Sequence, residues 1–583
     1  MYLTDVIYSA VSKLLTKDET TPSLQLHFCD HLSLQACALT EYQTKFSVVI
    51  YNPLARKRIF FVRLPVSDSK YEVTNHDGAE IEHQILPVSN TTKNIPERPA
   101  STAKNDLLFK ANLSPLAIST FFIQKKEAIE KQDIKEDEMQ DWLEEKVIDL
   151  VEQSSGSEPY KNAVEMIENQ YYTVTVDRKT GLISRIWNKH EDVAIKLKQN
   201  LLYYVGHTGY NYNSDSQASG AYIFRPESNK PIPIRQNAAV RIVSFKGSLV
   251  QEIRQEFCSW ASQVIRLYDN QSHIEIEWTV GPIPSGSGSE GREIISKYMT
   301  DLNTEGTLYT DLNGRETLKR KRDERGTWQF YQSEPVAGNY YPITSRASIM
   351  DERAEKQLTI LVDRSEGAAS IQDGNLEIMI HRRTFYDDSL GVTEPLTEYG
   401  ASGKGIVVRG KHYIMLNKIS NAASVYRPLY QNVYLQPFIA FATGQPHYSD
   451  WTNVRNTLWS GVTAELPGNI NLLTLDVLSE PIVETPYTPL LLRLEHIFEK
   501  LEDTRMSSPE TVNLKTLFRP FSIIEAIELS LGANMKKEDM ARFKWKTKGD
   551  RLQNVINHMD NDLNIELSPM EIRSFQINIH YYQ

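Results

Sequence analysis

Long apolar runs and positive charge are the two features that this sequence most plainly lacks. No stretch of about 18 apolar residues occurs, so no segment is expected to cross a membrane as a helix. The 64 Lys and Arg residues are outnumbered by 75 Asp and Glu, which gives a formal net charge of −11. Because cationic surfaces are what bind phosphate backbones, this balance argues against nucleic acid. We therefore expect neither a membrane nor a nucleic acid among the partners.

A signal peptide is also missing from the first residues. Asp5 and Lys13 interrupt the apolar stretch there, and no cationic start precedes it. The apolar residues recur instead at the i, i+3, i+4 and i+7 spacing of an amphipathic helix. They are Leu3, Val6, Ile7, Ala10, Val11, Leu14 and Leu15. A stripe this wide needs partners to cover it, so we interpret residues 1–20 as the last helix of a truncated helical bundle.

Cysteine is scarce, with 3 residues in the whole chain. Cys29 and Cys37 lie close together near His27 and His31, and imidazole and thiolate are the usual zinc ligands. A zinc site is therefore one interpretation, although no Cys-x-x-Cys pair or second ligand cluster accompanies it. We favour a disulfide between Cys29 and Cys37, if the protein is exported. Cys258 has no obvious partner and is predicted to be a small, buried apolar residue.

Several common functional motifs are absent. The glycines between residues 285 and 291 lack the Lys-Ser/Thr ending of a phosphate-binding loop, and no Gly-x-Ser-x-Gly nucleophile elbow occurs. Asn90, Asn112 and Asn270 stand in Asn-x-Ser/Thr sequences and are candidate glycosylation sites. Three such acceptors are no more than chance gives in a chain this long, so they do not decide whether the protein is exported.

What the sequence does contain is the alternation of β-strands, together with 29 tyrosines, a residue that favours strands. Apolar and polar residues alternate over 172–176, 274–280 and 376–380, which is typical of antiparallel sheets with one solvated face. No long helical segments intervene, which argues against a parallel sheet. The predicted fold class is mainly β, with stacked antiparallel β-sandwich domains (a super-sandwich) and the N-terminal helix described above.

Changes in composition divide the chain into units. Residues 125–158 are dense in Glu, Asp and Lys and nearly free of aromatic residues, so they are predicted to form a linker or a solvated helix. We therefore expect the bundle helix at 1–20, a small β domain at 21–124, a charged linker at 125–165, a large β-sandwich domain at 166–443 and a C-terminal β domain at 444–583.

The stretch around Tyr222 is the strongest candidate for a binding loop. It reads Ser-Gly-Ala-Tyr-Ile-Phe-Arg-Pro at 219–226 and follows a polar, aromatic and aperiodic segment. A phenol on a glycine-supported loop can be directed into a cleft, where it donates and accepts hydrogen bonds to sugar hydroxyls. Spacing alone favours the plainer interpretation of a tyrosine stacked on a turn of a β-sandwich.

A family resemblance adds to this interpretation. The sequence resembles the lysosomal α-mannosidases of glycoside hydrolase family 38 in a series of stretches that occur in the family's order. These are SGAYIFRP (219–226), GPIP (281–284), YTDLNGRE (309–316), EPVAGNYYPI (334–343), LTILVDRSEGAAS (358–370), LEIMIHRR (376–383), LRLEH (492–496) and SPMEIRSF (568–575). The similarity covers the chain from end to end, except for the charged linker.

The resemblance implies an enzyme whose catalytic machinery lies elsewhere. In this family an N-terminal α/β domain holds zinc, the nucleophile and the acid, and a helical bundle and β domains follow. The family's His-x-Asp-x-Gly-Trp zinc motif is missing here, and the nearest echoes, at 76–77 and 190–192, are interpreted as surface or turn groups. We therefore expect no catalytic residue and no metal ligand in this chain. We expect the missing N-terminal catalytic domain to be its partner.

What the resemblance does carry over is a supporting role at the rim of the active site. Tyr222 matches the family tyrosine that contacts bound mannose near the nucleophile. The family also brings a loop with Arg-Gly to the substrate, after a segment matched here by 382–383 and 387–388. Leu390 stands where that arginine is expected, before Gly391, so the role survives only if the backbone performs it. Tyr222, Leu390 and Gly391 are therefore the predicted substrate-binding residues.

The predicted function follows from the same resemblance. The chain is expected to belong to an α-mannosidase that hydrolyses α-mannosyl linkages of glycoprotein glycans in the lysosome or outside the cell, with zinc in the complete enzyme. By itself it is expected to be inactive. The alternative is a non-catalytic carbohydrate-binding module or pseudo-enzyme that binds mannose-containing glycans.

Overall fold

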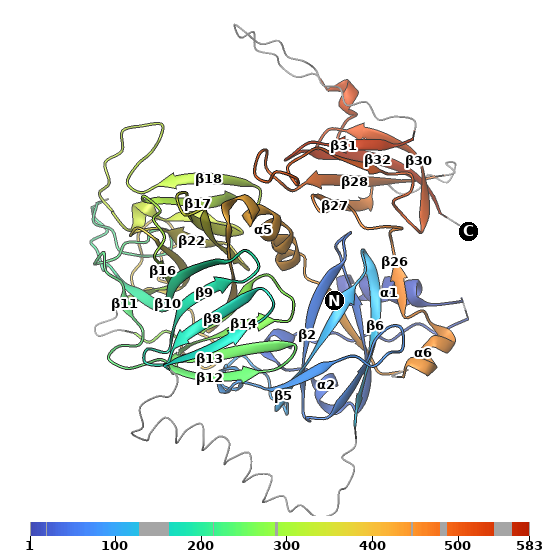
Figure 1. Cartoon of the computed structure of the whole chain (residues 1–583), viewed down its shortest axis with the longest axis horizontal. Coiled ribbons are helices and arrows are strands. Elements are labelled where there is room, and N and C mark those ends of the chain that lie inside the picture. Colours follow the sequence, from blue (N-terminus) through green and yellow to red (C-terminus); the bar gives the residue numbers. More distant parts are fainter. Residues whose placement is uncertain are drawn as a thin grey trace, which may run out of the picture.

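The structure, a computed structural model, describes residues 2–18, 20–126, 163–213, 215–285, 290–444, 447–478, 487–540 and 562–581. Most of its elements are strands in antiparallel sheets, which confirms the mainly β fold class (Figure 1). Among the described residues, no helix is both long and apolar enough to cross a membrane. The predicted linker at 125–165 lies almost wholly outside the described residues.

Two nine-stranded sheets form the large sandwich, drawn in teal to yellow in Figure 1. The first has the order β19-β22-β23-β16-β10-β9-β8-β7, with β11 paired to β10. Its strands are β7 (Val164–Glu168), β8 (Tyr172–Asp177), β9 (Leu182–Asn188), β10 (Val193–Gly206), β11 (Ile232–Pro233), β16 (Gly291–Thr300), β19 (Tyr341–Ile343), β22 (Glu366–Ala369) and β23 (Asn375–Arg383).

The second sheet of the sandwich has the order β12-β13-β14-β15-β24-β21-β20-β17-β18. Its strands are β12 (Arg241–Lys246), β13 (Val250–Cys258), β14 (Ala261–Tyr268), β15 (Ile274–Val280), β17 (Thr307–Leu312), β18 (Glu316–Lys321), β20 (Arg346–Asp351), β21 (Lys356–Val362) and β24 (Val408–Lys418). Val174, Ile276 and Ile378 belong to one buried core shared by the two sheets. Each such side chain contributes about 1.5–3 kcal/mol when fully buried, so the alternating pattern is what closes the sandwich.

The small β unit combines strands from distant parts of the chain. One sheet has the order β25-β1-β6-β26, with β3 paired to β6, and a three-stranded sheet has the order β2-β5-β4. The elements are β1 (Lys45–Tyr51), β2 (Arg58–Val66), β3 (Tyr71–Thr74), β4 (His83–Pro87), β5 (Asn105–Leu113), β6 (Ala117–Lys125), β25 (Phe438–Ala442) and β26 (Leu458–Ser460), with η1 (Leu32–Leu34), α2 (Ala38–Tyr42), α3 (Asn90–Lys93) and α6 (Tyr448–Val454). The predicted limits of the five units stay a prediction.

The C-terminal part forms a four-stranded sheet, β27-β28-β32-β30, and the pair β29-β31, drawn in red in Figure 1. Its elements are β27 (Ile470–Val477), β28 (Thr488–His496), β29 (Glu510–Asn513), β30 (Phe521–Leu529), β31 (Asn564–Leu567), β32 (Ile572–Tyr581) and η3 (Lys537–Asp539). Residues 521–529 form a strand, and Phe521, Ile523 and Ala526 turn toward a core of this sheet.

Helices are few among the described residues, and the longest of them was not predicted. The expected N-terminal helix is present as α1 (Tyr2–Leu15), where Val11 and Leu15 are buried but Val6 is 66% exposed. Its membership of a truncated bundle stays a prediction. The unpredicted helix is α5 (Ile419–Tyr434), which packs Ala422, Ala423 and Tyr426 beside β21 and β24. Pro428 lies inside it, and a proline usually marks the end of a helix rather than its interior. The remaining short element is η2 (Ala337–Asn339).

Candidate functional site

The topology of the first sheet brings the predicted binding residues to one edge. β10 and β23 both pair antiparallel with β16, so they run in the same direction on either side of it. Gly206, the last residue of β10, lies opposite Gly291, while Arg383, the last residue of β23, lies opposite Arg292. The two loops that follow, which carry Tyr222 and Leu390–Gly391, therefore leave the sheet side by side.

A single buried carboxylate joins these two loops. Asp388 is 0% exposed, and its Oδ2 accepts hydrogen bonds from the backbone N–H of Tyr222 at 2.6 Å and of Ile223 at 3.0 Å. Its Oδ1 accepts from the backbone N–H of Leu390 at 3.3 Å. Hydrogen bonds to an ionised acceptor are stronger than neutral ones, so Asp388 fixes the backbone on both sides of the predicted site. We call this arrangement the Asp388 clamp.

Further contacts hold the loops together around the clamp. Gln217 donates its side-chain N–H to the carbonyl of Asp388 at 2.9 Å, and Asn211 donates to the carbonyl of Asp387 at 2.5 Å. A Cβ on Gly220 would lie 2.8 Å from the Cβ, Cγ and backbone N of Asp388. Only glycine allows this approach, which is the physical reason for the Ser-Gly-Ala-Tyr sequence.

The side chains themselves are turned outward. Tyr222 is 63% exposed and Leu390 is 50% exposed. A Cβ at Gly391 would meet no atom within 4 Å, so its φ of +122° rather than crowding is what calls for glycine there. The clamp therefore holds the backbone rigidly while it presents a phenol to the surroundings.

A second buried acid supports the loop that carries Tyr222. Glu293 of β16 is 0% exposed and accepts a hydrogen bond from the Ser219 hydroxyl at 2.6 Å. Arg382 of β23 forms an ion pair with Glu293 and donates to the carbonyl of Ile223 at 2.9 Å. Sequence reasoning missed Glu293, because β16 carries other charged residues, Arg292 and Lys297, and nothing local marks Glu293 as the buried acid.

The two loops carry further exposed aromatic side chains besides Tyr222. Tyr210 is 77% exposed and Tyr386 is 38% exposed, each in one of the two loops that the clamp joins. Together with Tyr222 and Leu390 we call them the aromatic rim. Arg225 ties in a third loop, because it pairs with Glu334 at 3.1 Å and donates to the carbonyl of Gln217 at 2.9 Å. Rings and phenol hydroxyls at one edge of a sheet suit the faces and hydroxyls of a sugar.

The residues that the structure describes form no metal-binding cluster near this site. Within the described ranges, no three His, Cys, Asp or Glu side chains converge as they would to hold a metal ion. Glu191, one of the predicted turn groups, accepts from the Asn417 side chain at 2.6 Å and from the Lys418 backbone at 2.7 Å. The described residues do not fit a zinc ion, so zinc ligands would have to come from residues outside these ranges.

The predicted disulfide is present. Cys29 and Cys37 are bonded, with their Cα atoms 5.4 Å apart, and both pack at the core of the small β unit. Cys258 is half-buried beside the sandwich core, rather than buried, and burial raises the pKa of its thiol. Asn90, Asn112 and Asn270 are all exposed. Their glycosylation stays a prediction.

Comparison with known proteins agrees with the geometry. Residues 167–390, which contain both loops of the clamp, match the glycosyl hydrolases family 38 C-terminal domain. The chain is 38% identical to the human (Homo sapiens) lysosomal alpha-mannosidase over 558 residues, which is 95% of this chain and 51% of that protein. It is 34% identical to the alpha-mannosidase of Canavalia ensiformis over 602 residues, 98% of this chain and 57% of that protein.

A solved structure shares the fold. The crystal structure of an alpha-mannosidase from Enterococcus faecalis matches with a TM-score of 0.52 and 12% identity, over 94% of this chain and 57% of that one. The chain thus spans about half the length of the curated relatives it matches. On these similarities, the chain belongs to glycosyl hydrolase family 38, with residues 167–390 matching that family's C-terminal domain.

Proposed function

We propose that this chain supports the active site of an α-mannosidase that removes α-mannosyl residues from glycoprotein glycans. The observation that carries the proposal is the Asp388 clamp, which fixes the backbone of Tyr222 and Leu390 and leaves the Tyr222 phenol exposed. A fixed phenol can bind a sugar hydroxyl without losing much conformational entropy, which is what a substrate-positioning residue requires.

The chain supplies binding and orientation in this proposal. Tyr222 donates or accepts a hydrogen bond to a mannose hydroxyl, and the aromatic rim packs against the rest of the glycan. The Leu390 backbone is held by Asp388, so any role of that backbone is kept, while a role that needs a guanidinium is lost. In complete family enzymes zinc holds mannose hydroxyls and stabilises developing charge.

Catalysis in this proposal depends on groups beyond the described residues. A retaining glycosidase needs two carboxyl groups about 5–5.5 Å apart across the scissile bond. Both oxygens of Asp388 are engaged by backbone N–H groups, and Glu293 is bound by Ser219 and Arg382. Neither carboxylate is available as a nucleophile or acid, so the purified chain should be inactive alone.

The direct test is an activity assay on the purified chain. We expect no release from a chromogenic α-mannoside, with or without added zinc, and zinc-dependent turnover would contradict the proposal. Joining the chain to the family's catalytic α/β domain should give an active enzyme. In that enzyme, Tyr222→Phe should raise KM more than Tyr386→Phe does, because the second tyrosine lacks the clamped backbone.

A second candidate function is a carbohydrate-binding module, and the exposed aromatic rim favours it. Here the isolated chain should bind α-mannosides saturably in calorimetry, with a loss of affinity in Tyr222→Phe. Absence of binding at millimolar sugar would exclude the binding-module function, and the supporting role would be the remaining proposal. By analogy with the lysosomal relatives, we propose the lysosome as the place of action, which microscopy of the tagged protein can check.

A further inference from the structure

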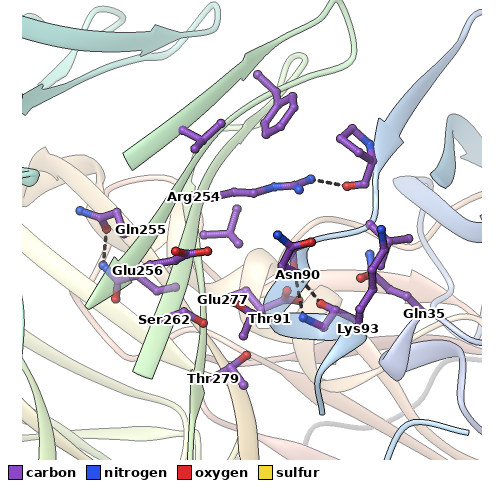
Figure 2. A pocket seen from close by; sticks show the side chains of 18 of the residues that line it. Gln35, Asn90, Thr91, Lys93, Arg254, Gln255, Glu256, Ser262, Glu277 and Thr279 are labelled. Carbon is purple, nitrogen blue, oxygen red and sulfur yellow. Dashed lines mark hydrogen bonds between the residues drawn. The ribbon is translucent and has the colours of Figure 1, made fainter. Parts of the chain in front are cut away.

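A cavity lies between the small β unit and the large sandwich, and it shares no residue with the Tyr222 loops (Figure 2). Its volume is about 260 Å³. One wall is the segment from Pro87 to Lys93, and the other is formed by side chains of β12 to β15 and β24. The side chain of Arg254, labelled in Figure 2, donates a hydrogen bond of 2.7 Å to the carbonyl of Pro87. We call this cavity the junction cavity.

Positive charge dominates the lining of the junction cavity. Two acidic side chains, Glu256 and Glu277, line it. The basic residues that line it are Arg63, Lys93, Arg241, Arg254, Arg266 and Arg409. This excess of basic residues has the opposite sign to the net charge of the whole chain, which is −11. A cationic cavity in an acidic protein concentrates anions from solution.

Some of these cations are neutralised within the protein. Arg266 pairs with Glu252 at 3.0 Å, with Glu275 at 2.9 Å and with Glu277 at 3.2 Å. Arg254 also pairs with Glu252, at 2.6 Å. These carboxylates therefore belong to the protein's own ion network, and they neutralise the charges of Arg254 and Arg266.

Arg409 is not neutralised in this way. Its three hydrogen bonds go to neutral oxygens: the Thr279 hydroxyl at 3.0 Å, the Thr92 hydroxyl at 2.8 Å and the Ser33 carbonyl at 3.2 Å. Among the described residues, no carboxylate lies within ion-pair distance of its guanidinium. Burial lowers the pKa of Arg409, and the negative charges of Glu277 and Asp106 offset this only in part.

Arg63 is only partly satisfied. Its nearest carboxylates are Asp106 at 3.5 Å and Glu252 at 3.6 Å, and both are longer than a charge-assisted hydrogen bond. Its Nε and Nη1 atoms are buried and have no hydrogen-bond acceptor within the part of the chain that the structure describes. Buried donors without acceptors cost about 1–3 kcal/mol each, so an acceptor placed beside Arg63 would be favourable.

We propose that the junction cavity binds an oxyanion, the phosphate or sulfate ester group of a small anionic ligand. Arg409 and Arg63 are its charge partners, with Lys93, which is exposed beside them, as a third. Hydroxyl groups of Thr91, Ser262 and Thr279 line the same cavity and can donate to further oxygens. Because the ligand contacts both the small β unit and the sandwich, its binding stabilises their junction. This site is independent of the proposed mannosidase function.

The test is a calorimetric titration with inorganic phosphate, inorganic sulfate and glycerol 2-phosphate, at constant ionic strength held with chloride. The chain is produced without N-glycans, because Asn90 is exposed at the cavity. We expect saturable binding of at least one of these anions and a higher melting temperature in its presence. Absence of saturable binding for all three overturns the proposal.

Variants then locate the binding. Arg409→Gln should weaken it about tenfold, and Lys93→Gln about threefold, because each loses one charge partner. Lys179→Gln removes the same charge from an exposed turn outside the cavity and should bind like the wild type. If Arg409→Gln keeps the wild-type melting temperature and the wild-type affinity, the proposal fails. If it is destabilised, Lys93→Gln decides, and an unchanged affinity there overturns the assignment.

The pH dependence separates the two sources of the anion. A phosphate ester gains its second charge near pH 6, whereas a sulfate carries a constant charge over this range. An affinity for glycerol 2-phosphate that rises from about pH 5.5 to about pH 7.5 would support a phosphate ester, with its second pKa near 6. An affinity for sulfate that exceeds that for phosphate at both pH values would support a sulfate ester.

Discussion

Replacing Asp388 with asparagine tests the clamp on which the proposed function depends. The carboxylate accepts three backbone hydrogen bonds: two at Oδ2, of 2.6 and 3.0 Å, and one at Oδ1, of 3.3 Å. Asparagine keeps one carbonyl oxygen, which can serve Tyr222 and Ile223 without the charge. Its amide group then faces the backbone N–H of Leu390, so that bond is lost.

The expected magnitude follows from these three bonds. Hydrogen bonds to charged groups contribute about 1.5–3 kcal/mol and neutral ones about 0.5–1.5 kcal/mol, so two weakened bonds and one lost bond amount to roughly 3.5 kcal/mol at the lower ends of these ranges. At about 1.4 kcal/mol for each factor of ten, the loop should open about 300 times more often. Asp388→Ala leaves all three N–H groups without an acceptor and should have a larger effect.

Hydrogen exchange followed by mass spectrometry measures this opening. Peptides that cover 219–226 should exchange about 300-fold faster in Asp388→Asn, by the free-energy argument above. Asp387→Asn is the matched control, because the Asp387 side chain accepts only a local bond from the Ser389 N–H, at 3.1 Å. Equal exchange in both variants, or unchanged exchange in Asp388→Ala, would refute the role given to the clamp.

Three further predictions concern packing, pH and the disulfide. Gly220→Ala should lower the free energy of unfolding, or the free energy needed to open the loop, by about 2 kcal/mol, because its Cβ would meet the clamp at 2.8 Å. Gly326→Ala is the control and should be neutral in the same melting assay, because its Cβ would meet no atom within 4 Å. Burial raises the pKa of Asp106 from 3.8 to about 6, so the folded state binds a proton more tightly than the unfolded state. Stability should therefore rise by roughly 1 kcal/mol from pH 7 to pH 5 relative to Asp106→Asn, and an identical pH profile in the two proteins would contradict this. Removing the disulfide with Cys29→Ser and Cys37→Ser should cost about 2–3 kcal/mol in denaturant unfolding, since it frees a short loop, and an unchanged midpoint would count against it.

The sign of the Asp106 prediction depends on its neighbours. Burial is the main cause of the raised pKa, and Glu252 adds to it by repulsion while Arg63 opposes it. Burial alone would raise the pKa of Glu252, but the charges of Arg266, Arg63 and Arg254 hold it at about 2, below the ordinary 4.5 of a glutamate. The stability that Glu252 contributes is lost only when the pH falls below about 4.5 toward 2, so it does not act between pH 7 and pH 5.

The sequence by itself determined the local structure, because the period of apolar residues reports which face of a strand is buried. Residues 172–176 and 274–280 alternate, and both lie in strands whose apolar side chains fill the sandwich core. The disulfide was also within reach, since Cys29 and Cys37 are close in the chain. The residues that matched the family, Tyr222 and Leu390 with Gly391, were found by resemblance and not by spacing.

Only the tertiary structure decided which distant segments meet. Nothing in the local pattern of 438–442 indicates that it pairs with β1, about 390 residues earlier, because strand pairing depends on backbone groups that every sequence has. The same holds for Asp388 and Tyr222, which are 166 residues apart and meet because β10 and β23 flank one strand. The sequence thus specifies which faces are buried, whereas the order of the strands decides which loops form the site.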